Sequence, residues 1–239
     1  MNNIELNVQA IFDSIDGEAN GFYGAGELTT FIRLKGCNLN CIYCDTTYAQ
    51  NSKPENWIAV DEIMKQVHFP KVTITGGEPL LQRTNLLPLV ETLLVNGYDV
   101  SIETNGTELP FAEIDTSFRR LRYIVDFKLP SSGMMEYMKS MVFASLCATD
   151  VIKFVISNEE DYGYAKMLIL EHPRWVARKV FSPVVEYEKD CNPQYVHIPK
   201  VLDMRWPRQL AKMMIQDKVN AQFSLQIHKV LWPGVKEER

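Results

Sequence analysis

The chain contains the stretch GCNLNCIYCDT, residues 36–46, in which Cys37, Cys41 and Cys44 are spaced C-x3-C-x2-C. A cuboidal iron-sulfur cluster is normally held by four thiolates, so a set of three leaves one iron open to another molecule. The alternative is a zinc site completed by a distant histidine or cysteine. Zinc sites usually show a second pair of ligands, and the sequence has no second arm. The spacing therefore favours a cluster over zinc.

Length and composition favour one enzyme-sized domain over residues 1–239. Hydrophobic residues make up 46% of the chain, which is enough for a core, and no linker interrupts it. The 25 basic and 30 acidic residues give a formal charge of -5, so we expect no direct nucleic-acid binding. The first ten residues show no leader pattern, and no apolar run reaches about 18 residues, so we expect a cytoplasmic protein without membrane contact. An odd number of cysteines indicates reduced thiols that serve a metal, with Cys147 and Cys191 left as core or surface residues.

Short β-rich runs alternate with helical patterns, which is typical of a parallel sheet covered by helices. Strands are predicted at residues 28–34, 71–75, 99–103, 121–126, 151–156, 179–182 and 221–228. Helices are predicted around Val60–Val67, from an N-cap at Thr84 with Pro88 near the first turn, from Ser157 to Pro173, and from Pro207 onward. About six βα units predict an α/β fold: a partial or distorted (βα)6-type barrel with a mostly parallel sheet.

Polar and glycine-bearing segments follow five of these strands. The cysteine loop follows the first strand, Gly76-Gly77-Glu78-Pro79 the second and Glu103-Thr104-Asn105-Gly106 the third; Asp126-Phe127-Lys128 and Ser182-Pro183 follow later strands. Sites in parallel α/β proteins gather at the carboxyl ends of strands. We therefore expect these segments to meet at one site.

The combination of C-x3-C-x2-C after a first strand with GGEP after the second resembles the radical S-adenosylmethionine superfamily. The resemblance implies a 4Fe-4S cluster whose open iron is chelated by S-adenosylmethionine, and a 5'-deoxyadenosyl radical released by reduction of the sulfonium. Glycines allow a backbone to approach a ligand closely, and the cofactor handles the radical while the protein positions it. Gly76 and Gly77 would then face the methionine end of the cofactor, and Tyr43 would pack near the adenine.

A narrower resemblance covers nearly the whole chain and points to the 7-carboxy-7-deazaguanine synthases. It rests on FIRLKGC at residues 31–37, CDT at 44–46, DFKLPSSGM at 126–134, DVIKFVIS at 150–157 and LQIHKVLWP at 225–233. The loop that precedes the first strand in that family has a Q-G-E-G pattern, and this chain has Asp16 in place of the glutamine. The resemblance implies a single radical enzyme domain with a substrate loop at about 12–27, a cluster loop at 36–46 and a family-specific segment at about 184–239.

The resemblance also implies a substrate, 6-carboxy-5,6,7,8-tetrahydropterin, which undergoes a radical ring contraction with loss of ammonia. Arg33 would pair with the substrate carboxylate, because a planar guanidinium offers two parallel donors. The remaining substrate contacts would be Ile15, Asp16, Gly17, Glu18, Thr75 and His228. Contacts to S-adenosylmethionine would be Tyr43, Gly76, Gly77, Glu103, Asn105, Lys128, Ser182 and Pro183.

Thr46 corresponds to the family residue that binds a magnesium ion in contact with the substrate, and Asp45 would hold one of the water ligands of the ion. A hydroxyl with substrate oxygens and waters suits Mg²⁺. The resemblance further implies a small electron-donor protein such as flavodoxin or ferredoxin, and a homodimer.

Two other functions fit parts of the pattern. An activase of a glycyl-radical enzyme would use the same cluster on a protein substrate and would need neither Arg33 nor magnesium. A metal-binding regulator would hold the cluster without catalysis and would produce no 5'-deoxyadenosine. The GGEP and ETNG segments argue against a regulator, because a scaffold does not need a cofactor site.

Overall fold

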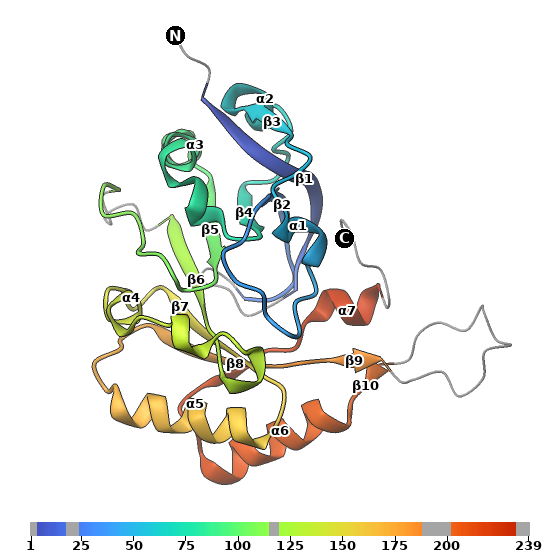
Figure 1. The fold of residues 1–239 in the computed structure, drawn as a ribbon, viewed down its shortest axis with the longest axis vertical. Coiled ribbons are helices and arrows are strands. Elements are labelled where there is room, and N and C mark those ends of the chain that lie inside the picture. Colours follow the sequence, from blue (N-terminus) through green and yellow to red (C-terminus); the bar gives the residue numbers. More distant parts are fainter. Residues whose placement is uncertain (1–3, 18–23, 115–119, 188–201, 233–239) are drawn as a thin grey trace, which may run out of the picture.

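The computed structural model describes residues 4–17, 24–114, 120–187 and 202–232 (Figure 1). Its strands are β1 (Glu5–Asp16), β2 (Glu27–Leu34), β3 (Trp57–Ala59), β4 (Lys71–Gly76), β5 (Asp99–Thr104), β6 (Leu121–Phe127), β7 (Val151–Ile156), β8 (Arg178–Pro183), β9 (Glu186–Tyr187), β10 (Leu202–Asp203) and β11 (Gln222–Phe223). Its helices are α1 (Thr47–Gln50), α2 (Val60–Met64), α3 (Arg83–Val95), α4 (Ser140–Ala144), α5 (Glu159–Glu171), α6 (Arg205–Asp217) and α7 (Ile227–Leu231), with 3-10 turns η1 (Pro79–Gln82), η2 (Pro130–Ser132) and η3 (Met135–Tyr137).

A nine-stranded sheet forms the centre of the described residues, in the order β11-β8-β7-β6-β5-β4-β2-β1-β3. In this order every neighbouring pair from β11 to β2 is parallel, whereas β1 is antiparallel to both β2 and β3. The two edge strands of this order, β11 and β3, are not paired with each other, so the sheet is curved but not closed. This architecture confirms the predicted partial barrel with a mostly parallel sheet.

The outer face of the sheet is apolar and carries the helices. Alternate residues of the central strands, such as Ile74, Ile102 and Phe154, are fully buried and belong to one core with the inward side chains of α3, α5 and α6. Figure 1 shows these three helices outside the curved sheet. Because strand side chains alternate between faces, the residues between these core positions point to the other side of the sheet. No helix among the described residues is long and apolar enough to cross a membrane.

The opposite surface, which we call the inner face, is polar although it is buried. Phe12 of β1 stacks on Phe31 of β2 there, and the hydroxyls of Thr29 and Thr73 lie 3.1 Å apart. The same alternation places on this face a set of buried polar residues: Asp16, Thr29, Lys71, Thr73, Thr75, Ser101, Lys153 and Ser182. Burying polar groups is costly unless partners satisfy them, so a polar inner face indicates a surface built to receive a ligand.

The N-terminal strand was not predicted from the sequence. β1 extends to Asp16, so the first five residues of the loop expected at 12–27 belong to a strand. The side chains of β1 do alternate between the two faces of the sheet, because Leu6 and Val8 enter the core. The polar residues in its second half make this pattern hard to recognise in the sequence. Ser14 and Asp16 face the inner surface, whereas Asp13 is exposed and contacts His68. Glu18 and Cys191 lie outside the described residues, as do most of residues 184–201.

Three other local predictions are wrong. The residue at the N-cap of α3 is Gln82, not Thr84, because the turn η1 leads directly into the helix. Pro88 lies in the second turn of α3 rather than near its start. The last predicted strand, 221–228, contains only the two residues of β11, and Ile227 begins α7. The strand at Val151–Ile156 and the helix that ends before Pro173 are confirmed.

Candidate active site

The cysteine loop leaves β2 at the carboxyl edge of the sheet and is fixed by backbone hydrogen bonds. The N–H groups of Gly36 and Cys37 donate to the carbonyls of Ala49 (2.8 Å) and Gln50 (3.0 Å) of α1. On the other side, Ile42 N–H donates to the Ser132 carbonyl at 3.1 Å. The loop is therefore held between α1 and η2, which presents its cysteines beside the inner face.

Cys37, Cys41 and Cys44 are half-buried free thiols. Burial raises the pKa of Cys41 and of Cys44, and the nearby Lys128 ammonium opposes that effect at both. No three His, Cys, Asp or Glu side chains of the described ranges gather closely enough to hold a single metal ion. Three thiols on one loop, two of which lie beside a cation that favours the thiolate form, fit the ligand set of a cluster with one open iron.

Gly76 and Gly77 are required by the backbone itself. A Cβ on Gly77 would lie 2.1 Å from the Gly36 carbonyl oxygen, and one on Gly76 would lie 2.2 Å from the Leu34 carbonyl oxygen. Gly77 N–H donates to the same Leu34 carbonyl at 3.1 Å. The two glycines thus allow the end of β4 to contact the start of the cluster loop, a packing role that the sequence did not reveal.

Glu78 is a further residue of the site that sequence reasoning missed, although it stands inside the GGEP segment. Its fully buried carboxylate accepts hydrogen bonds from Leu80 N–H (3.0 Å), Thr104 Oγ1 (2.7 Å) and Asn105 N–H (2.6 Å). Burial raises the pKa of Glu78 to about 7, while these three donors act in the opposite direction. Glu78 therefore ties the end of β4 to the end of β5.

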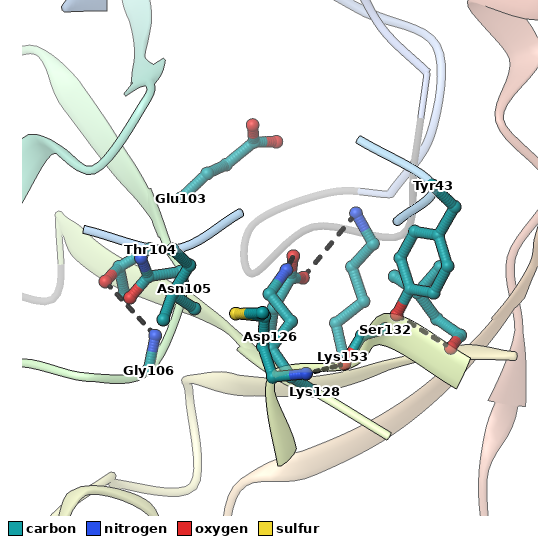
Figure 2. A network of polar contacts seen from close by, with 12 residues as sticks. Tyr43, Glu103, Thr104, Asn105, Gly106, Asp126, Lys128, Ser132 and Lys153 are labelled. Atoms are coloured by element: carbon teal, nitrogen blue, oxygen red, sulfur yellow. Dashed lines mark hydrogen bonds and ion pairs between the residues drawn. The ribbon is translucent and has the colours of Figure 1, made fainter. Parts of the chain in front are cut away.

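A charged group lies where β6 and β7 meet the loop, and its contacts can be followed in Figure 2. Asp126 Oδ2 pairs with Lys128 Nζ at 2.6 Å, and Asp126 Oδ1 lies 3.8 Å from Lys153 Nζ. Burial opposes both charges, but the pair holds the pKa of Asp126 below and that of Lys128 above its usual range. Tyr43 donates to the Val155 carbonyl at 3.5 Å, and burial raises its pKa. Lys153 was not predicted; a lysine inside the apolar run VIKFVI was the available signal.

Several polar atoms of the inner face have no hydrogen-bond partner among the described residues. They include Arg33 Nε and Ser182 Oγ, together with the hydroxyls of Ser14 and Ser101. The guanidinium of Arg33 lies 5.5 Å from the ring centre of Phe12 and 5.8 Å from that of Tyr48. Arg33 is thus held between two aromatic rings with a buried donor still unused, as expected of a residue that awaits an anionic ligand.

The predicted pterin contacts are divided by the sheet. Thr75 donates to Glu103 Oε2 at 2.7 Å on the inner face, next to Arg33 in register. Asp16 also lies on that face, but its carboxylate forms a buried ion pair with Lys71, whose ammonium also lies 3.3 Å from Glu27. The side chain of Ile15 points to the opposite face of β1, so Ile15 can contact a ligand on the inner face only through its backbone.

Helix α7 joins the end of β1 to the cluster loop. Ile227 N–H donates to the Gly17 carbonyl at 3.0 Å, and His228 lies directly against Gly17. Lys229 Nζ pairs with Asp45 Oδ2 at 3.0 Å, and the Thr46 hydroxyl donates to Asp45 Oδ1 at 2.9 Å. Burial would raise the pKa of Asp45, but Lys229 and Thr46 hold it well below its usual range. Asp45 and Thr46 thus offer oxygen ligands to a metal ion, and Lys229 already neutralises the charge of Asp45.

Of the remaining predicted cofactor contacts, Pro183 ends β8, one residue after Ser182.

Comparisons with known proteins find relatives over nearly the whole chain. The model of the radical SAM superfamily matches residues 31–126, which include the cysteine loop and the strands from β4 to β6. A 7-carboxy-7-deazaguanine synthase from Koribacter versatilis is 34% identical over 95% of this chain and 97% of its own length. The enzyme of the same name from Chlorobaculum tepidum is 35% identical over 95% and 94%, respectively.

A relative from Clostridium acetobutylicum with the same name is 36% identical over 92% of this chain and 93% of its own. Among solved structures, QueE from Escherichia coli superposes with a TM-score of 0.67 over 93% of this chain and 94% of the other. Its sequence identity is 20%, so this likeness supports the fold alone.

Proposed function

The chain belongs to the 7-carboxy-7-deazaguanine synthase family of radical S-adenosylmethionine enzymes, and on that premise we propose that it converts 6-carboxy-5,6,7,8-tetrahydropterin into 7-carboxy-7-deazaguanine. The product and one ammonia together contain every atom of the substrate. The reaction therefore consumes no net oxidant or reductant, which agrees with a cofactor that is regenerated.

The observation that carries this proposal is the position of Arg33. Its Nε is buried on the inner face without a hydrogen-bond partner among the described residues, and β2 leads from it directly to Cys37. A guanidinium held in this way suits a carboxylate, and the substrate has one carboxylate. Substrate and cofactor would then meet at the carboxyl edge of the sheet, as ligands do in other parallel α/β folds.

Cys37, Cys41 and Cys44 would hold the 4Fe-4S cluster, which with S-adenosylmethionine supplies the radical chemistry when both are bound. The groups of this chain around it would bind and orient the cofactor. Lys128 is a buried cation beside the loop, and the Ser182 hydroxyl has no hydrogen-bond partner among the described residues. The other proposed contacts are Tyr43, Gly76, Gly77, Glu103 and Pro183.

Arg33 and Thr75 would fix the carboxylate end of the pterin near the cysteines. The Asp16 and Lys71 pair lies at the opposite end of the same strands, because Asp16 pairs in register with Glu27 at the start of β2. This chain has aspartate where the family usually has glutamine, and Lys71 forms an ion pair with that aspartate. The ion pair fixes the Asp16 carboxylate on the inner face. Backbone groups of Ile15 and Gly17, with Glu18 and His228, would complete the substrate contacts.

We further propose that Thr46 binds a magnesium ion, with Asp45 holding one of its waters. Mg²⁺ usually takes few protein ligands and keeps several waters, which suits one hydroxyl and one carboxylate. The Lys229 ammonium already neutralises Asp45, so binding of the ion would have to displace or share this ion pair. We therefore expect this chain to bind the ion weakly.

The electron donor, cellular location and oligomeric state are proposed on the same premise. The reaction needs a small-molecule substrate. Reduction of the cluster also needs an electron source, which we expect to be a protein such as flavodoxin or ferredoxin. We propose that the enzyme is a cytoplasmic homodimer and that residues 1–239 form a single radical SAM domain. We also propose that its product enters the synthesis of queuosine or other deazapurines.

The decisive experiment is anaerobic cluster reconstitution, followed by incubation with reductant, S-adenosylmethionine, magnesium and the carboxytetrahydropterin. Mass spectrometry should detect the deazaguanine carboxylate and an equal amount of ammonia. Absence of product from protein with a spectroscopically intact cluster would refute the assignment. Production of 5'-deoxyadenosine with a peptide substrate only would instead indicate the activase function.

A further inference from the structure

Asn105, at the end of β5, contacts the cluster loop through its side chain (Figure 2 shows its position beside Thr104). Its amide Nδ2 donates to Asn38 Oδ1 at 2.8 Å and lies 3.7 Å from Cys37 Sγ in hydrogen-bonding geometry. Its Oδ1 accepts from the backbone N–H of Thr107 at 3.1 Å and from the Thr107 hydroxyl at 2.8 Å. The residue is 7% exposed.

These four contacts use the whole hydrogen-bonding capacity of the side chain. A carboxamide has two N–H donors and two acceptor lone pairs, and each has a protein partner here. Asn105 thus has no polar group left for S-adenosylmethionine, although its sequence position suggests that contact. The amide points toward a cluster ligand instead.

The surroundings hold this amide in one orientation. Asn38 Nδ2 donates to Thr107 Oγ1 at 2.9 Å, which closes a ring of hydrogen bonds among Asn38, Asn105 and Thr107. The buried carboxylate of Glu78 accepts from the backbone N–H of Asn105 at 2.6 Å and so fixes the main chain below it. The sulfur of Cys37 also receives the backbone N–H of Leu39 at 3.5 Å. Cys37 is therefore approached by two N–H donors.

We propose that Asn105 is a positioning residue that donates its amide N–H to the Cys37 thiolate and thereby raises the reduction potential of the cluster. The inference rests on the proposed cluster and extends it to a residue with a different role. A hydrogen bond to a ligand sulfur withdraws negative charge, which favours the more electron-rich reduced form. The ring formed with Asn38 and Thr107 keeps the donor in place in both oxidation states.

The test is a potentiometric titration of the reconstituted cluster, followed by electron paramagnetic resonance without substrate. Asn105→Leu keeps the approximate shape and removes the donor. We expect the reduction equilibrium to become less favourable by up to about tenfold, which equals about 59 mV for a one-electron couple. Pulsed spectra should also lose one exchangeable proton coupled to the cluster. An unchanged potential in a variant with full iron and sulfide content would overturn the proposal.

The affinity for S-adenosylmethionine separates the two roles of Asn105. It should stay within a few-fold of the parent in Asn105→Leu, because the amide has no group free for the cofactor. A loss of affinity of more than tenfold at an unchanged potential would make Asn105 a cofactor ligand and overturn the proposal. Asn85→Leu, which removes an amide that donates to the Glu5 carbonyl far from the loop, is the matched control.

If Asn105→Leu fails to bind a cluster, Thr107→Val provides the same test. It keeps the amide of Asn105 but removes the hydroxyl that holds its Oδ1, so the potential should fall in the same direction by a smaller amount. No change in Thr107→Val would then overturn the proposal. None of these measurements needs the pterin, so a protein that fails to make the deazaguanine but shows the shift would refute the proposed substrate alone.

Discussion

The buried carboxylate of Glu78 makes the stability of this protein depend on pH in a way that can be measured. Its pKa is raised to about 7 because it is fully buried, and the hydrogen bonds from Asn105, Thr104 and Leu80 offset only part of this effect. In the unfolded chain the pKa should return to the usual value of a glutamate, about 4.3. A group whose pKa is raised on folding contributes stability below its unfolded pKa and loses it as the pH rises through its folded pKa.

The size of this effect follows from the shift. A difference of roughly 2.7 pKa units corresponds to about 3.7 kcal/mol in all, at about 1.4 kcal/mol per unit, and about 3 kcal/mol of this is lost between pH 4.5 and pH 8. Glu78→Gln removes the titration, and it also replaces the acceptor of Asn105 N–H by an amide donor, which should cost about 2 kcal/mol at every pH. The difference in unfolding free energy between parent and variant should therefore be largest near pH 4.5 and smaller by about 3 kcal/mol near pH 8.

The assay is anaerobic urea unfolding of both apo-proteins across this pH range, with Glu91→Gln on the exposed side of α3 as the control for the substitution itself. Other titrating groups cancel in the comparison of parent and variant. If the difference in unfolding free energy between the parent and Glu78→Gln did not change from pH 4.5 to pH 8, the Glu78 carboxylate would be ionised over this whole range. The three donors would then outweigh burial, and the reasoning would be refuted.

Three further predictions concern the loop and the substrate. Arg33→Lys should raise the KM for the pterin at least tenfold, because lysine cannot bind a carboxylate through two parallel donors, and iron content should not change; loss of the cluster would show that Arg33 has a different role. Thr46→Ala should raise the magnesium concentration needed for half-maximal activity, and an unaltered dependence would remove Thr46 as a ligand. Gly77→Ala should displace the loop at Gly36 and lower cluster occupancy, since the new Cβ would lie 2.1 Å from a carbonyl oxygen. Gly163→Ala in α5, where a Cβ meets no atom within 4 Å, should instead stabilise the protein by up to about 1 kcal/mol and leave occupancy unchanged.

The sequence predicted the central parallel strands well because both of their neighbours are strands and one of their faces is entirely apolar. Val151–Ile156 is an example: Ile152, Phe154 and Ile156 on its outer face all belong to the core, and its boundaries agree with the prediction. The strand β1, which lies between β2 and the edge strand β3, is not predicted because half of its residues face a polar interior, so its sequence pattern resembles that of a loop. The first two residues of α7 fall in a predicted strand because the helix is short and its position depends on Gly17 and Asp45, both distant in sequence.

The spacing of the three cysteines predicts them as cluster ligands, whereas the residues that hold their loop in place could not be predicted from the sequence. Glu78, Asn38 and Thr107 act through hydrogen bonds between segments that are far apart in the chain, and no local pattern records such pairs. The predicted role of Asn105 illustrates the limit. Its position at the end of a strand is consistent with a cofactor contact, but the direction of its amide is decided by Asn38 and Thr107.

The polar inner face also has a cost that a ligand would remove. Leaving a buried polar atom without a partner costs about 1–3 kcal/mol, and the unsatisfied atoms of Ser14, Arg33, Ser101 and Ser182 lie on this face. A ligand that satisfies Arg33 and Ser182 binds only the folded chain, so part of its binding energy should appear as stability. The core on the other side of the same strands compensates for this cost without ligand, because alternate residues of each strand are fully buried there. The alternation within single strands therefore separates two tasks: one face of each strand packs in the core, and the other face carries unsatisfied polar groups that a ligand can satisfy.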